Sequence, residues 1–161
     1  MTYWACLVFV LMAAPAAFGA GMNDILGPWE TDGKSSAVEL FRCGDKICGK
    51  VVRLKHPDYV DNKDGPVGTP KKDRKNPDPS LRDRPIIGLQ VIEGLSPAGD
   101  NRWDNGSCYD PESGHSYRCK VHLASSERLE VRGFIGFSLF GRTYVLTRKD
   151  ILAAAAKPAP L

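Results

Sequence analysis

Eight short segments with strand-like composition follow one another along this chain, and helical periodicity is nearly absent beyond residue 20. In the segment 128–134, Leu129 and Val131 alternate with charged residues, which is typical of a strand buried on one face. Most connections are short, so we predict an all-β fold, an eight-stranded up-and-down antiparallel β-barrel, with a two-sheet sandwich as the alternative. The predicted strands cover residues 27–31, 36–43, 47–54, 86–93, 102–109, 116–123, 128–134 and 142–148.

Two residues at opposite ends of this region indicate how such a barrel closes. Trp29 lies in the first predicted strand, and Arg148 ends the last one. A guanidinium can lie flat over an indole while it donates hydrogen bonds to nearby carbonyl oxygens. We therefore expect Trp29 and Arg148 to be structural and to pin the two ends of the barrel together.

The first 20 residues resemble a secretory signal peptide. Residues 2–20 carry no charge, and the apolar stretch 4–14 has the length of a signal core but is too short to span a bilayer. Small residues follow, so we expect cleavage between about residues 16 and 21. No lysine or arginine precedes the apolar core, which leaves an uncleaved anchor or a buried N-terminal helix as alternatives.

The remainder has the size of one domain, which we place at residues 25–150, followed by a flexible tail at 151–161. All charged side chains lie beyond residue 20, so the processed chain keeps the formal net charge of +3. This mild charge predicts no strong attraction for nucleic acid. No further apolar run approaches membrane-spanning length, so we expect no stable membrane insertion after processing.

Four cysteines lie beyond residue 20, and an even number in an exported chain indicates disulfides. Cys43 and Cys48 flank one predicted hairpin turn, with Asp45 and Lys46 at its tip, and the second pair flanks another. We therefore expect two disulfides, with free thiols or a metal site as alternatives. The expected pairs are Cys43 with Cys48, and Cys108 with Cys119.

One connection, residues 55–85, is about thirty residues long and contains six prolines. It is either a solvated surface loop or a lid over the barrel mouth. Within it, Asn76 begins a proline-stiffened turn that could hold Arg82 and Arg84 at the rim, where they would receive a carboxylate or phosphate group. In the alternative interpretation, the two arginines pair with acidic neighbours and only fasten the loop. Those neighbours are Asp78 and Asp83.

Aromatic residues near the predicted strands are further candidates for a binding site. Tyr109 and Tyr117 flank a turn in which Asp110 would accept backbone N–H bonds and Gly114 would supply a positive φ. The two phenols could instead be polar groups of a cavity. Trp103 is a large ring that could line the same cavity.

Several sequence blocks occur together in an order that resembles the exported bacterial family called domain of unknown function 2147. The blocks are Gly27-x-Trp29, Cys43 to Gly49, Asn76 to Arg82, Arg84 to Leu89, Tyr109-Asp110-Pro111, Gly114, Tyr117 and Gly141 to Thr143. The resemblance covers nearly all of the chain beyond the signal peptide. It implies a lipocalin-like barrel of the calycin superfamily with an internal cavity, located in the periplasm or secreted, and it implies no established activity.

The sequence contains few of the residue patterns that indicate an enzyme. The three histidines lack metal-ligand spacing, and there is no nucleophile elbow, phosphate loop or dinucleotide fingerprint. We expect no enzymatic activity, no cofactor and no metal. The expected function is binding of a small hydrophobic or amphipathic ligand in the barrel. The alternatives are an envelope protein-protein interaction module with a side-chain-filled barrel and, with less support, a small periplasmic enzyme.

Overall fold

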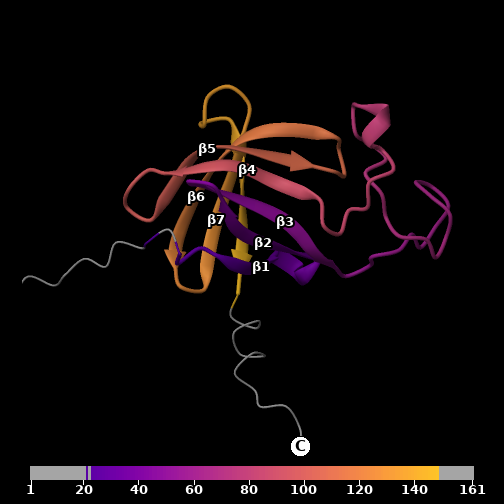
Figure 1. Cartoon of the computed structure of the whole chain (residues 1–161), viewed down its shortest axis with the longest axis horizontal. Coiled ribbons are helices and arrows are strands. Elements are labelled where there is room, and N and C mark those ends of the chain that lie inside the picture. The colour runs from indigo at the N-terminus through magenta and orange to yellow at the C-terminus, as the bar shows by residue number, and fades with distance from the viewer. Residues whose placement is uncertain (1–20, 22, 149–161) are drawn as a thin grey trace, which may run out of the picture.

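Eight antiparallel strands close into a barrel in the computed structural model of the chain, which describes residue 21 and residues 23–148 (Figure 1). Each strand pairs with the next along the chain, and the last pairs with the first. The predicted architecture is therefore confirmed. The expected signal peptide and the expected tail at 151–161 lie outside the described residues.

The element bounds agree with the prediction to within a few residues, except at the fourth strand. The strands are β1 (Gly27–Thr31), β2 (Ser36–Cys43), β3 (Lys46–Leu54), β4 (Gln90–Pro97), β5 (Arg102–Asp110), β6 (His115–Ser125), β7 (Arg128–Phe134) and β8 (Gly141–Thr147). Two 3-10 turns are η1 (Asp32–Lys34) and η2 (Pro79–Leu81).

The fourth strand begins four residues later than predicted, at Gln90 rather than at residue 86. Gly88 has φ +91°, and the Leu89 N–H donates to the Ile86 carbonyl at 3.1 Å, so the chain turns at this point. Ile86 itself donates its N–H to the Lys71 carbonyl in the long connection. The two isoleucines that resembled a strand therefore end the connection instead, which runs over residues 55–89.

Successive strands run in opposite directions, so the connections between them lie alternately at the two ends of the barrel. Four of them lie at what we call the loop end, and they are residues 32–35, 55–89, 111–114 and 135–140. The other three, at the base, are residues 44–45, 98–101 and 126–127. Figure 1 shows the long connection in magenta extending away from the strands, beside the hairpin of β5 and β6.

Large apolar side chains fill the base of the barrel. Gly49 and Gly106 face this interior, and a methyl group added at either would crowd its neighbours. Its carbon would lie 2.9 Å from Leu40 Cδ2 at Gly49 and 2.6 Å from Leu95 Cδ2 at Gly106. The interior around these glycines is therefore close-packed. The most deeply buried apolar residues of the interior are Trp29, Leu40, Ile47, Leu95, Trp103, Val121 and Leu129.

One of the two expected disulfides is present. Cys43 and Cys48 are bonded, with 5.8 Å between their Cα atoms, and the hairpin tip is Gly44-Asp45 rather than Asp45-Lys46 because Cys43 pairs with Lys46.

The expected bond between Cys108 and Cys119 is absent, and both are free thiols. Their register is diagonal, since Tyr117 lies opposite Cys108 and Gly106 lies opposite Cys119. The hydrogen bond with Cys119, and then burial, raise the pKa of the Cys108 thiol far above its ordinary value. The prediction was wrong because it assumed that the two cysteines lie directly opposite each other. Their positions are instead offset by two residues along the pair of strands.

The predicted closure by Trp29 and Arg148 is present at the base. The guanidinium of Arg148 lies 4.4 Å from the ring centre of Trp29, which is fully buried. Its Nη1 donates to the Leu26 carbonyl at 3.2 Å, its Nη2 to the Asp24 carbonyl at 2.8 Å, and its Nε to the Ser126 carbonyl at 2.5 Å. One side chain therefore joins the N-terminal segment, the last strand and the turn between β6 and β7.

We expect Arg148→Ala to destabilise the protein by about 1–3 kcal/mol, because it removes the stacking on Trp29 and three hydrogen bonds to carbonyl oxygens. Urea unfolding of the variant measures this loss. Arg118→Ala is the matched control, because Arg118 is exposed and its guanidinium lies 5.8 Å from the ring of Phe134 without bonding a strand end. An Arg148→Ala variant as stable as the control would contradict the structural role.

We expect the folded protein to hold one disulfide and two thiols beyond residue 20. When the protein is unfolded under non-reducing conditions, the chain beyond residue 20 should take up two alkylating groups, one on Cys108 and one on Cys119. Mass spectrometry of peptides counts them and identifies the modified residues. Alkylation of neither cysteine in the unfolded chain would show that this pair is oxidised as well.

Candidate functional site

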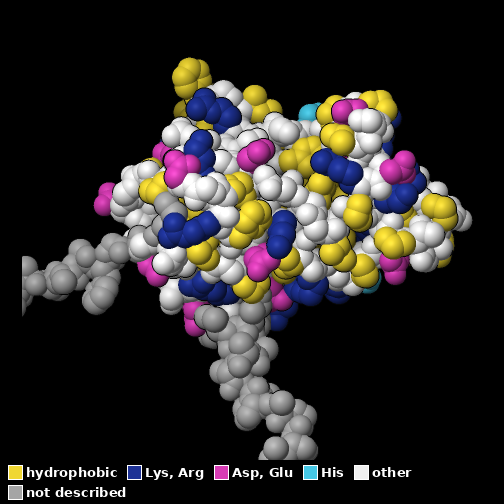
Figure 2. Space-filling model, in the orientation of Figure 1, with side chains coloured by type: hydrophobic (Ala, Val, Ile, Leu, Met, Phe, Trp, Pro, Cys, Tyr) yellow, Lys and Arg dark blue, Asp and Glu magenta, His cyan; other side chains and the backbone are white. Residues whose placement is uncertain are grey.

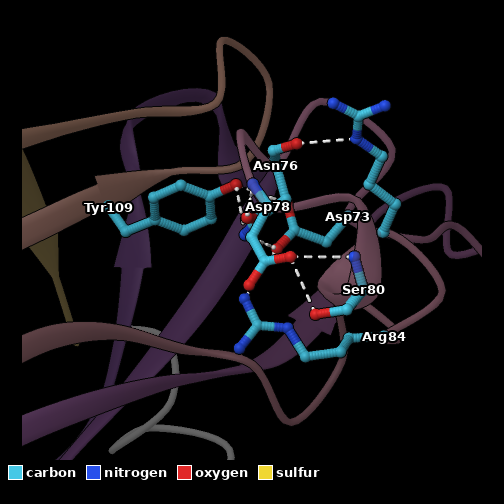
Figure 3. Close-up of polar contacts among 7 residues, drawn as sticks. Asp73, Asn76, Asp78, Ser80, Arg84 and Tyr109 are labelled. Atoms are coloured by element: carbon cyan, nitrogen blue, oxygen red, sulfur yellow. Dashed lines mark hydrogen bonds and ion pairs between the residues drawn. The ribbon is translucent and has the colours of Figure 1, made fainter.

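A buried carboxylate lies at the centre of a polar cluster between the long connection and β5 (Figure 3). Asp73 is completely buried. The Tyr109 hydroxyl donates to its Oδ1 at 2.5 Å, while Arg84 Nη2 and Asn76 Nδ2 each donate to its Oδ2 at 2.8 Å. Three donors, one of them a cation, offset the cost of burying this charge.

Asn76 also organises the proline-rich turn that follows it. Its Oδ1 accepts the Asp78 N–H at 2.9 Å, and its own carbonyl accepts Arg82 Nε at 2.7 Å. Asp78 then caps η2, since its Oδ1 accepts the Ser80 hydroxyl at 2.8 Å and the Ser80 N–H at 2.9 Å. These two hydrogen bonds, the hydroxyl first, lower the pKa of Asp78. The turn is therefore stabilised locally as well as through Asp73.

The hairpin of β5 and β6 has the turn that the sequence predicts, and it supports the long connection. Asp110 accepts the Glu112 N–H at 3.0 Å and the Ser113 hydroxyl at 2.6 Å. Gly114 has φ +75°, and a Cβ there would lie 2.0 Å from the Lys75 carbonyl oxygen. Any other residue would be strained and would also push the connection away from the hairpin.

The arginines fasten the connection, though not through the partners named from the sequence. Arg84 pairs with Asp73 instead of Asp78 or Asp83, and Arg82 bonds a backbone carbonyl. Asp83 instead forms ion pairs with Lys72 at 3.1 Å and with Arg74 at 2.9 Å. These two cations, Lys72 first, lower the pKa of Asp83. Since both arginines bond groups of the connection itself, the geometry supports the fastening interpretation, and a ligand role for Asn76, Arg82, Arg84 and Tyr109 stays a prediction.

Asp73 is the functional residue that the sequence reasoning missed. It is the single acidic residue within 71–75, where lysine and arginine occupy the other four positions. An isolated acid in a basic run is exposed in most solvated loops. Its neighbourhood in the sequence does not identify it, because two of its donors, Arg84 and Tyr109, lie 11 and 36 residues away in the chain.

Other candidate residues lie on the inner face of the barrel. In antiparallel ladders, directly opposed residues share a face. Tyr117 and Cys108 are opposed, and both are partly buried. Tyr144 lies opposite the buried Val131, so it faces inward, yet 58% of its surface is exposed. The inner face at the loop end is therefore open to solvent along β8.

Trp103 does not join these residues. It lies near the start of β5, at the base of the barrel, and is 2% exposed. Its indole Nε1 is buried and meets no hydrogen-bond acceptor within residues 21 and 23–148. Arg84 Nε is likewise buried and has no hydrogen-bond partner among the described residues. Trp103 therefore packs as a core residue, away from the exposed inner face.

The outer face of β5 to β8 carries a shallow depression of about 290 Å³ lined mainly by charged residues. Lys120 and Asp104 form an ion pair across neighbouring strands at 3.3 Å, and His122 Nδ1 lies 3.5 Å from a carboxylate oxygen of Glu130. Such pairs stabilise an exposed sheet face only weakly. The depression is therefore a solvated ion-pair network, and we assign no ligand to it.

Within the part of the chain that the structure describes, no three histidine, cysteine or acidic side chains come together as a metal site would require. The same residues include no helix with the length and apolar character needed to cross a bilayer.

A closed barrel of eight antiparallel strands, with a packed base and one long connection at the other end, defines a lipocalin-like protein. Residues 27–148 match the family model described as "Uncharacterized protein conserved in bacteria (DUF2147)", and the chain belongs to this family. A solved structure, protein HP1028 from the human pathogen Helicobacter pylori, described as belonging to the lipocalin family, is similar with a TM-score of 0.66 and 25% sequence identity. The alignment covers 85% of this chain and 92% of HP1028. A comparison with curated proteins finds no match.

Burial, and next the hydrogen bond to Asp73, raise the pKa of Tyr109 to about 12 from the ordinary value of 10.0. A folded-state pKa above the unfolded one means that the folded protein binds more protons, so this stabilisation is present below pH 10 and is lost as the pH rises through about 12. We expect the wild-type free energy of unfolding to fall more steeply between pH 10 and 12 than that of Tyr109→Phe. Urea unfolding across this range measures the difference, with Tyr144→Phe as the exposed control. Parallel curves for all three proteins would contradict it.

Proposed function

We propose that this protein is an exported, periplasmic or secreted, binding protein that holds a small amphipathic molecule at the loop end of its barrel. The observation that carries the proposal is the exposure of Tyr144, which faces the interior side of the ladder opposite buried Val131. An inner face that remains open to solvent at one end of a lipocalin-like barrel is a surface that a small molecule can reach.

The side chains along the inner face of β8 suggest the chemistry of the ligand. Arg142, opposite Gly133, lies nearest the loop end and is exposed. Tyr144 follows it along the strand toward the base, and Leu146, the deepest of the three, is only 4% exposed. A cation at the rim, an aromatic ring below it and an aliphatic side chain at depth match a molecule with an anionic head group and a short apolar body. Tyr117 on β6 would add a second ring. We propose no reaction for this site.

A second candidate function is an envelope interaction module, and the packed base favours it. The tight contacts around Gly49 and Gly106 mean that side chains fill the interior next to both glycines. In this case the long connection, held by Asp73 against β5, would be the partner surface. The two functions differ in what occupies the inner face at the loop end, so one variant can separate them.

Gly133→Leu is the variant that tests ligand binding. Gly133 lies on the inner face, and the nearest atom to an added Cβ is Tyr117 Cβ at 3.8 Å, so a Cβ is accommodated and a leucine side chain would extend over the open inner face. We expect at least about tenfold weaker binding of an anionic naphthalene probe, measured by fluorescence titration, since a blocked site loses its apolar contacts. Ser107→Leu, which adds the same side chain at an exposed position, should bind as the wild type does.

Native mass spectrometry of the protein purified from a periplasmic extract provides the complementary measurement. A co-purified molecule that Gly133→Leu loses and Ser107→Leu keeps would support the binding site. Equal probe affinity in all three proteins, with no co-purified molecule, would overturn the ligand proposal and favour the interaction module.

A further inference from the structure

The connection between β7 and β8 exposes a concentrated set of large apolar side chains. Its four large hydrophobic residues are each between 71% and 81% exposed, and they are Ile135, Phe137, Leu139 and Phe140. In Figure 1 this connection projects at the top of the molecule, and Figure 2 shows hydrophobic side chains there with basic side chains directly beneath. Clustered exposure of this kind marks an interaction surface rather than ordinary surface variation.

The projecting loop has a fixed conformation, because one arginine holds it from below. Arg132 donates Nε to the Ser138 carbonyl at 2.8 Å and Nη2 to the Leu139 carbonyl at 3.2 Å. The Phe140 N–H donates to the Phe137 carbonyl at 3.1 Å. Three carbonyls of the loop are thus hydrogen-bonded inside the molecule. A loop whose polar backbone is satisfied in this way can enter an apolar medium at lower cost.

Arginines flank the loop in the sequence. Residues 131–147 contain two arginines, Arg132 and Arg142, and no acidic residue, and residues 115–123 are likewise free of acids. Arg142 follows the loop by two residues, and Arg118 on β6 lies 5.8 Å from the ring of Phe134 at the foot of the loop. The apolar tip is therefore bordered by cations, which attract an anionic surface.

We propose that the tip formed by Ile135, Phe137, Leu139 and Phe140 inserts into the surface of an anionic lipid bilayer, with the flanking arginines at the level of the phosphates. A bilayer accepts a projecting convex tip, whereas a protein partner would need a matching hollow. The basic border and the internally bonded backbone both favour the lipid surface. The two proposals share Arg142, but none of the four tip residues lies on the inner face of a strand, so changes at the tip leave the proposed ligand site in place.

Vesicle flotation of the purified processed protein tests this contact. We expect binding to vesicles of equal parts phosphatidylglycerol and phosphatidylcholine, weak binding to pure phosphatidylcholine, and loss of binding as salt screens the arginines. The double variant Phe137→Ser with Phe140→Ser should bind the anionic vesicles at least about tenfold more weakly, because it removes the two largest inserted side chains.

The control carries two equivalent changes in the long connection, Val60→Ser with Val67→Ser, where both valines are exposed. It should bind as the wild type does, and a common N-terminus, verified by mass spectrometry, makes any contribution from residues 1–20 equal in all proteins. Unchanged binding by the tip variant would overturn the proposal. So would wild-type self-association, measured by light scattering, that only the tip variant abolishes, since the tip would then bind a second copy of the chain.

Discussion

The barrel closes along a short seam, and much of the structure depends on how that seam is secured. Among the described residues, β1 and β8 pair at two positions, Glu30 with Thr147 and Thr31 with Leu146. So short a ladder gives few hydrogen bonds to hold the ends of a barrel together. The guanidinium of Arg148 compensates at the base, where it bonds three carbonyl oxygens and covers the buried indole of Trp29. Side-chain hydrogen bonds thus supplement the ladder where backbone pairing is short.

The same seam explains why the loop end is open. β1 ends at Thr31, where the chain turns into η1, so residues 141–145 of β8 lack a paired strand on that side. Their inward-facing side chains consequently remain exposed, although β7 carries buried residues directly opposite. The hairpin of β7 and β8 also extends past its neighbour, which lets its tip project. The exposed inner face and the apolar tip therefore have one structural cause.

The sequence predicts the fold well because its evidence is local. Alternation and turn residues define most strands, and the pairing of Trp29 with Arg148 follows from the chemistry of an indole and a guanidinium. The prediction fails where tertiary contacts decide, as at Ile86, whose strand-like neighbourhood serves the long connection instead. It fails again at Cys108 and Cys119, because the turn at 111–114 pairs Asp110 with His115 and so places Tyr117, not Cys119, opposite Cys108.

The candidate site shows the same division between local chemistry and distant contacts. Asp110 and Gly114 could be assigned from the sequence, since a turn is built from consecutive residues. Asp73 could not, because its donor Tyr109 is 36 residues away in the chain. Burial of that carboxylate fixes the long connection against β5 and away from the inner face of β8. The connection is consequently better placed to support the rim beside β5 than to cover the seam between β8 and β1.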